Sequence, residues 1–213
     1  MATFGQIQTA VSKRLLDPDH TAVSEPDVAS AINDTIRYWK YKRFWFNEGY
    51  AASIAVDQDA VIPLPADFLV PSTENDGFNI EYSAMRYPLK KLTQLQYDNI
   101  YLLNGFGLPR MYARVGTDYV LYPKPDRNYQ INCHYLKQYP DLVDSSSTND
   151  FTIYASRLLT LWTCANLIAE FRQDEKMEQY FRNAAQDEYK ELQTMTKKAN
   201  ASGSLVLSST LLT

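Results

Sequence analysis

Residues 105–136 have the sequence GFGLPRMYARVGTDYVLYPKPDRNYQINCHYL, which predicts three short β-strands and their turns. Gly107-Leu108-Pro109 predicts a turn, because glycine adopts unusual φ angles and proline fixes its own φ and extends the residue before it. The prolines in Pro123–Asp126 end the second strand, because proline has no N–H group to donate to a β-ladder. The strands are predicted at Met111–Val115, Tyr119–Tyr122 and Tyr129–Tyr135. We therefore expect an antiparallel meander without a catalytic residue.

The composition is that of a soluble globular protein with a substantial core. The chain has 213 residues, of which 45% are hydrophobic and 22% are charged. Its formal net charge of -4 gives no indication of nucleic-acid binding. Ten of the 16 tyrosines lie between Tyr82 and Tyr139. Tyrosine favours β-sheets, and it also favours interfaces where one end of its ring is buried and the other contacts water. The enrichment therefore indicates either an ordinary β domain or a binding surface.

No residue pattern indicates a catalytic group, a metal site or a cofactor. Cys133 and Cys164 are predicted to be small core residues in a reducing compartment. His20 and His134 have no evident partners, and the chain contains no nucleophile elbow, phosphate loop or His-Glu-x-x-His motif. The N-terminus has no signal-peptide pattern, and no apolar run approaches the length that spans a bilayer. We therefore expect synthesis in the cytoplasm and no membrane partner.

The hydrophobic patterns divide the chain into four segments. These are residues 1–46 with two helices, 47–140 with a β-rich domain, 141–198 with two further helices, and 199–213 as an extended tail. The second helix is predicted to start after Ser24, with Pro26 in its first turn, and to continue to about Phe44. The expected fold class is α+β: an antiparallel helical bundle from the N- and C-terminal helices, with an inserted antiparallel β domain and an extended C-terminal tail.

The end of the second helix combines basic and aromatic residues without an acid. Its basic residues are Arg37, Lys40, Lys42 and Arg43. This pattern is typical of nucleic-acid contact. The alternative is purely structural, because cations favour a helix C-terminus and aromatic rings there can pack against a neighbouring element.

The tail from residue 199 to 213 has no charged side chain and is predicted to bind a partner. Its large apolar residues are Leu205, Val206, Leu207, Leu211 and Leu212. Burying these five side chains returns less free energy than ordering the backbone of the segment costs, so the tail should be loose on its own surface. It could order by strand addition to another chain or in a groove of a partner. The alternative is a frayed terminus without a function.

The order of features resembles the head-to-tail adaptor, or connector, proteins of tailed bacteriophages. The motifs that support the resemblance cover nearly the whole chain. They are Ile32–Arg37, Phe44–Glu48, Leu64–Phe68, Gly107–Pro109 with Tyr112, Leu121–Asp126, and the strand that ends at Tyr135.

This resemblance implies a structural virion protein at the head-tail junction, made in the host cytoplasm. Such proteins form a ring, typically of twelve copies, beneath the portal, with genomic DNA passing through the centre without sequence-specific binding. The C-terminal tail and part of the bundle grip the portal protein, and the β part faces the tail or nozzle protein. On this basis the tail-side or inter-subunit contacts are expected at Tyr119, Tyr122 and Tyr129.

Two other functions remain open from the sequence. In the first, the chain is a monomeric binding module whose tyrosines stack on sugar rings or on single-stranded nucleic acid. In the second, it is a cell-wall hydrolase, although the chain has no compact acid pair on a recognisable cleft motif.

Overall fold

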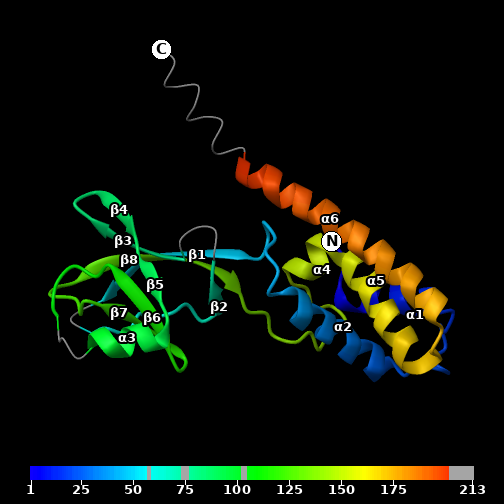
Figure 1. Cartoon of the computed structure of the whole chain (residues 1–213). Helices are drawn as coiled ribbons and strands as arrows, with labels where there is room; N and C mark the ends of the chain where they lie inside the picture. The colour runs from blue at the N-terminus through cyan, green and yellow to red at the C-terminus, as the bar shows by residue number, and fades with distance from the viewer. Residues whose placement is uncertain (57–58, 73–76, 102–104, 202–213) are drawn as a thin grey trace, which may run out of the picture. The chain divides into compact units, whose positions relative to one another are not determined.

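The computed structural model describes residues 1–56, 59–72, 77–101 and 105–201 (Figure 1). The chain divides into two compact units. The helical unit combines Met1–Asn47 with Tyr139–Thr213, and the β unit is the continuous segment Glu48–Gln138. The mixed α+β class predicted from the sequence is confirmed. The antiparallel direction of a bundle and the extended tail stay predictions.

Side chains cap the first turns of three helices of the helical unit. The helices are α1 (Phe4–Arg14), α2 (Glu25–Trp39), α4 (Asp150–Tyr154), α5 (Ser156–Leu167), the π-helical turn η1 (Ile168–Arg172) and α6 (Glu175–Ala201). The three capped helices are α1, α2 and α4. The predicted cap at Ser24 is confirmed, because its side chain accepts a hydrogen bond from the backbone N–H of Asp27. Thr3 forms a reciprocal capping box with Gln6 at the start of α1.

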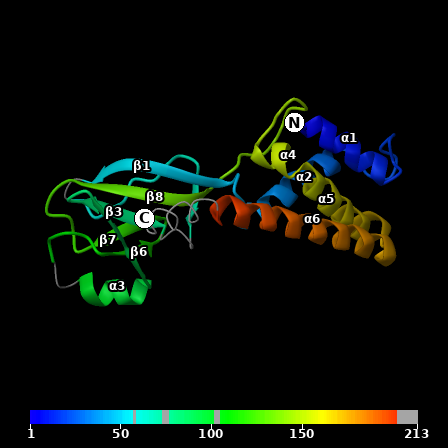
Figure 2. The same ribbon diagram turned by 90° about the horizontal axis from the view of Figure 1, so that it is seen from above.

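Helix α5 is the central element of the helical unit. It contacts α1, α2 and α6, and Figures 1 and 2 show α6 running alongside it. Buried apolar side chains of all four helices form one cluster. Examples are Val11 in α1, Ile32 in α2, Leu158 in α5 and Phe181 in α6. One continuous apolar core therefore holds the helices together.

Helix α2 ends earlier than the sequence predicts, at Trp39 instead of about Phe44. The buried side chain of Asn47 explains this difference. Its amide nitrogen donates to the carbonyls of Lys40 and Lys42, and its Oδ1 accepts the backbone N–H of Phe44. These bonds hold residues 40–47 in a compact turn, in which the backbone groups are satisfied without a further helical turn.

The β unit contains two sheets and one helix. Its elements are β1 (Glu48–Val56), β2 (Phe68–Pro71), β3 (Phe78–Tyr82), β4 (Met85–Pro88), β5 (Lys90–Leu92), α3 (Gln94–Tyr101), β6 (Met111–Val115), β7 (Asp118–Tyr122) and β8 (Tyr129–Lys137). The larger sheet has the order β1-β8-β3-β4, with β2 also paired to β8, and Figure 2 shows β1 and β8 side by side. The smaller sheet has the order β5-β6-β7.

The two sheets of the β unit share one apolar cluster, and α3 covers a second one. Ile80 and Ile131 of the larger sheet pack in the same cluster as Tyr112 and Leu121 of the smaller sheet. Tyr97 of α3 belongs to a separate small cluster with residues of β5 and β6. The smaller sheet is therefore apolar on both faces.

The predicted meander is wrong in its last step, although its three strands are present. β6 and β7 form an antiparallel pair, but β8 lies in the larger sheet, where it pairs with β1, β2 and β3. The segment after β7 pairs with residues 105–107 instead, since Lys124 exchanges backbone hydrogen bonds with Gly105 and Gly107. Prolines 123 and 125 cannot extend the β7 ladder, so the chain leaves the small sheet before β8 begins.

The sequence predicted a wholly antiparallel β domain, and this prediction is also wrong. β5 and β6 are parallel, with Lys90 opposite Met111 and Leu92 opposite Ala113. Helix α3 lies in the connection between them. A crossover of this kind returns the chain to the starting edge, so that the second strand runs in the same direction as the first.

Candidate partner-binding surfaces

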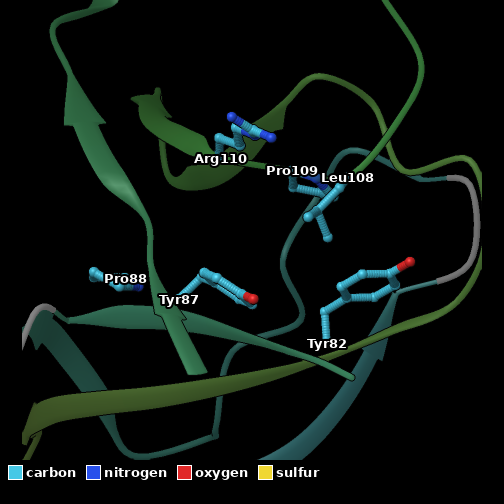
Figure 3. Close-up of a pocket in the computed structure, with 6 residues that line it drawn as sticks. All are labelled: Tyr82, Tyr87, Pro88, Leu108, Pro109 and Arg110. Atoms are coloured by element: carbon cyan, nitrogen blue, oxygen red, sulfur yellow. The ribbon is translucent and has the colours of Figure 1, made fainter. Parts of the chain in front are cut away.

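A groove of 430 Å³ opens between the β3–β4 hairpin and the turn before β6 (Figure 3). We call it the hairpin groove, and its lining residues are Tyr82, Tyr87, Pro88, Leu108, Pro109 and Arg110. Figure 3 shows the two tyrosine rings on one side of the groove and Leu108, Pro109 and Arg110 on the other. Apart from the guanidinium group and the two tyrosine hydroxyls, the lining side chains offer rings and aliphatic carbons. Such a surface is suited to an extended chain segment with apolar side chains.

The tight turn of the hairpin exposes these tyrosines. Ser83 and Ala84 form the two-residue turn, both with positive φ (52° and 59°), which matches the twist of a β-hairpin. Tyr82 and Tyr87 remain 37% and 41% exposed. The guanidinium carbon of Arg127 lies 5.9 Å from the centre of the Tyr82 ring and 5.8 Å from that of Tyr129. The cation therefore restrains one wall of the hairpin groove.

The tyrosines predicted as contacts are mostly part of the core. Tyr119 and Tyr129 are each 5% exposed, and Tyr122 is half-buried. The Tyr119 ring packs 5.3 Å from Phe78, and the Tyr129 hydroxyl donates to Asp126, which holds the pKa of that carboxyl below its usual value. Tyr119 and Tyr129 thus present no open ring face. The exposed pair Tyr82 and Tyr87 was missed, although they flank a turn at the spacing of a hairpin.

The four predicted basic residues differ in how far the fold engages or covers them. Arg37 bonds to Asp141 and to Asp34, and the hydrogen bond to Asp141 is the main reason that its pKa is raised. Lys40 is 8% exposed, and burial lowers its pKa. Arg43 is half-buried, and Lys42 is exposed. Arg37 is therefore engaged and Lys40 covered by the fold itself, and Arg43 also has an interaction partner.

Lys42 lines a second cavity, of 330 Å³, on the helical unit. We call it the indole pocket, and it is lined by Tyr38, Trp39, Lys42, Trp162, Gln186, Tyr189 and Lys190. Tyr38 and Trp162 stack with their ring centres 5.2 Å apart, and Trp39 meets the Trp162 ring edge-on at 5.0 Å. The sequence could not predict this pocket, because its walls come from α2, α5 and α6.

The tail residues predicted to bind the portal, residues 205–207, 211 and 212, lie outside the described residues. Within the described part of the chain, no group of three or more His, Cys, Asp or Glu side chains is arranged to hold a metal ion. None of the helices described here has both the length and the apolar character needed to cross a membrane. Burial raises the pKa of Cys133 and of Cys164 to about 12, so both thiols stay protonated at neutral pH.

Comparison with known proteins identifies a family. A family model described as SU10 adaptor protein matches residues 2–207. This range includes the β unit, nearly all of the helical unit and the first three apolar residues of the predicted tail. No curated protein matches the chain.

Proposed function

The chain belongs to the SU10 adaptor protein family, and from this membership we propose that it joins the portal of a tailed phage to the tail. The resemblance to phage head-to-tail adaptors found in the sequence is thereby confirmed at the level of the family. The protein is a structural component of the virion. The family match over residues 2–207 is the observation on which the proposal rests.

In the proposed assembly, twelve copies form a ring beneath the portal protein, and genomic DNA passes through the centre. The net charge of -4 supports a channel that does not retain DNA. Copies of the chain, the portal protein and a tail or nozzle protein are then its partners.

The portal-side contact is assigned to the C-terminal tail. Helix α6 is described to Ala201, and the apolar side chains from Leu205 to Leu212 follow it. Ordering such a segment requires backbone partners and an apolar surface, both of which a portal protein can supply.

The test is co-sedimentation of the purified chain with portal rings from the same phage. Deleting residues 202–213 leaves α6 intact, so the truncated chain should stay folded and no longer sediment with the rings. A full-length control in which the five apolar tail residues are replaced by serine should fail in the same way. Binding of the truncated chain at full strength would exclude the tail as the portal contact.

The hairpin groove supports a tail-side contact of the β unit. Tyr87→Ala removes one wall of the groove and should weaken binding of the tail or nozzle protein by about tenfold, which corresponds to the loss of one partly exposed aromatic contact. Tyr50→Ala is the matched control, because Tyr50 is 47% exposed in the same unit and does not line the groove. Equal binding by both variants would exclude the groove as the contact.

A further inference from the structure

The β unit contains a cavity of 460 Å³ whose charged lining residues are all basic. We call it the basic pocket, and its walls come from β2 and from all three strands of the smaller sheet. The charged residues are Lys90 and Lys91 of β5 and Arg114 of β6, and no carboxylate of the described residues lines the pocket. All three residues are exposed, so a partner can reach their charged groups from solvent.

The three charges have no counter-charge within the described part of the chain. None of them forms an ion pair there, and Nε of Arg114 donates instead to the carbonyl of Gly116 at 3.1 Å. Another cation of the β unit does meet an acid, since Nε of Arg86 lies 4.0 Å from a carboxylate oxygen of Glu81. Like charges that line one pocket repel each other unless an anion offsets them. The basic pocket therefore favours an anionic partner.

The segment around the basic pocket is basic, although the chain as a whole is acidic. The chain has a formal net charge of -4. Residues 82–117 contain one acid, Asp98, and the basic residues Arg86, Lys90, Lys91, Arg110 and Arg114. Arg110 lies next to the basic pocket, because its carbonyl accepts the backbone N–H of Lys90 at 2.9 Å, and it also lines the hairpin groove. A local positive potential of this kind attracts an acidic surface of a partner.

The walls of the basic pocket favour acidic side chains over the phosphates of duplex DNA. Val70, Pro71 and Leu89 give the pocket an apolar part beside its cations. An aspartate or glutamate side chain has aliphatic carbons that suit this part and a carboxylate that lysine and arginine bind. Duplex DNA is a stiff rod whose phosphates stay attached to sugars on both sides, so they contact open surfaces and do not enter a pocket. Because the pocket holds three cations, the observations favour a protein segment with more than one acid.

We propose that the basic pocket binds an acidic segment of the tail or nozzle protein. Aspartate or glutamate side chains of that segment pair with Lys90, Lys91 and Arg114. This inference rests on the proposed adaptor function, because that function brings the tail or nozzle protein to the β unit. Pro88 of the hairpin groove and Leu89 of the basic pocket are consecutive residues, so the basic pocket adds a charged contact next to the apolar one assigned to the groove.

The first test is cross-linking of intact phage particles with a carbodiimide, which joins lysine amines directly to carboxylates in contact with them. Peptide mass spectrometry should find Lys90 or Lys91 linked to an aspartate or glutamate of the tail or nozzle protein. Particles that contain the chain but leave both lysines unlinked, or linked only to the portal protein or to acids of this chain, would overturn the inference alone. Absence of the chain from the particles would overturn the adaptor function, and the inference with it.

The second test measures binding of the purified tail or nozzle protein to two triple variants with the same net charge. Lys90→Gln, Lys91→Gln and Arg114→Gln together remove the charges of the basic pocket at exposed positions, and they should weaken binding about tenfold, as expected for three partly exposed ion pairs. The matched control replaces three exposed lysines of the helical unit by glutamine, and it should bind like the unmodified chain. These lysines are Lys176, Lys197 and Lys198.

Three outcomes of this measurement would contradict the proposal. Equal binding by both variants would show that the basic pocket is not part of the contact. If the pocket variant lost affinity for a short DNA duplex and kept its affinity for the protein, DNA would be the ligand. If the unmodified chain did not bind the tail or nozzle protein, the tail-side contact itself would be excluded, and the inference with it.

Discussion

The helical unit closes its core with segments from both halves of the chain, whereas the β unit is built from the continuous segment Glu48–Gln138. In the helical unit, the side chain of Asn33 exchanges two hydrogen bonds with the backbone of Leu142, at 3.0 and 2.9 Å. Thr35 and Thr163 also share a buried hydroxyl contact of 3.0 Å. Polar pairs of this kind fix the register between distant segments, in addition to the apolar core.

The β unit is held by strand pairing and by tyrosine hydroxyls that donate to carboxylates. Tyr135 donates to Asp67 at 2.8 Å, and Tyr129 donates to Asp126. Its buried apolar side chains divide into two clusters instead of one. The comparison indicates that each unit has its own source of stability, so that a substitution in one should leave the other folded.

Truncating a central ring of each core should have the largest effect and should separate the units. Phe151 is fully buried, with the rings of Phe46 and Tyr139 both 5.2 Å away, and Phe151→Ala should cost the helical unit about 3–5 kcal/mol. The three tryptophans all lie in the helical unit, so their fluorescence during urea unfolding reports that unit alone. The midpoint should move to lower urea concentration.

Phe78→Ala is the matched change in the β unit, because Phe78 is also fully buried. It should leave the tryptophan midpoint in place and accelerate amide hydrogen exchange in β3 and β8. If it lowered the tryptophan midpoint as much as Phe151→Ala does, the two units would unfold together and the comparison would fail.

A smaller effect is expected where a strand glycine lies beneath a tyrosine ring. Gly49 of β1 faces Tyr135 of β8, and a methyl group at Gly49 would lie 2.5 Å from Cζ of that ring. The ring is held by Asp67, so Gly49→Ala should destabilise the β unit by about 1–3 kcal/mol, which hydrogen exchange of β1 and β8 measures. In a double-mutant cycle with Tyr135→Leu, the losses of unfolding free energy of the two single variants should add to more than the loss of the double variant. Strict additivity would show that the ring is not the obstacle.

The smallest effect concerns pH and belongs to the helical unit. The carboxylate of Asp17 accepts hydrogen bonds from the Thr21 hydroxyl and from the backbone N–H groups of Thr21, Ala22 and Val23. These bonds, that of the Thr21 hydroxyl first, lower the pKa of Asp17 from 3.8 to about 2. Because the folded state favours the charged form, its contribution is present above about pH 4 and is lost as the pH falls towards 2.

Thermal unfolding followed by tryptophan fluorescence at pH 5 and pH 2.5 measures this loss. Asp17→Asn should be less stable than the unmodified chain at pH 5 and should lose less stability on acidification. An equal dependence on pH in both proteins would show that Asp17 does not contribute to it.

Local signals in the sequence were sufficient for individual elements. The strands at Met111–Val115 and near Tyr119–Tyr122 were predicted because a tight turn separates two short β patterns, and Gly116 in that turn has a φ of 64°. The start of α2 was predicted because serine caps a free backbone N–H, proline fits the first helical turn, and acidic residues favour the N-terminus of a helix. These features depend on residues within a few positions of one another.

Pairing over long distances was not predictable in the same way. β8 was assigned to a meander with its nearest strands, yet its partners β1 and β3 begin at Glu48 and Phe78. The sequence pattern of a strand indicates that it is buried, but it does not indicate which strands form hydrogen bonds with it. Likewise, the end of α2 depends on hydrogen bonds from the Asn47 side chain to the carbonyls of Lys40 and Lys42. A pattern of apolar residues gives no information about such bonds.

For the candidate surfaces, too, local features were predictable and contacts between distant residues were not. The basic residues near the end of α2 were recognised, but one of the two acids that engage Arg37, Asp141, is more than a hundred positions away. The indole pocket draws on α2, α5 and α6, and the hairpin groove on both sheets of the β unit. Side chains that are distant in the sequence thus determine which cations and tyrosines remain available to partners.

Negative-stain imaging of portal rings from the same phage, with and without the purified chain, tests the adaptor assignment most directly. We expect a collar of added density on one face of the portal ring, and we expect it to disappear when residues 202–213 are deleted. Bare portal rings beside the free, folded full-length chain would exclude the adaptor function.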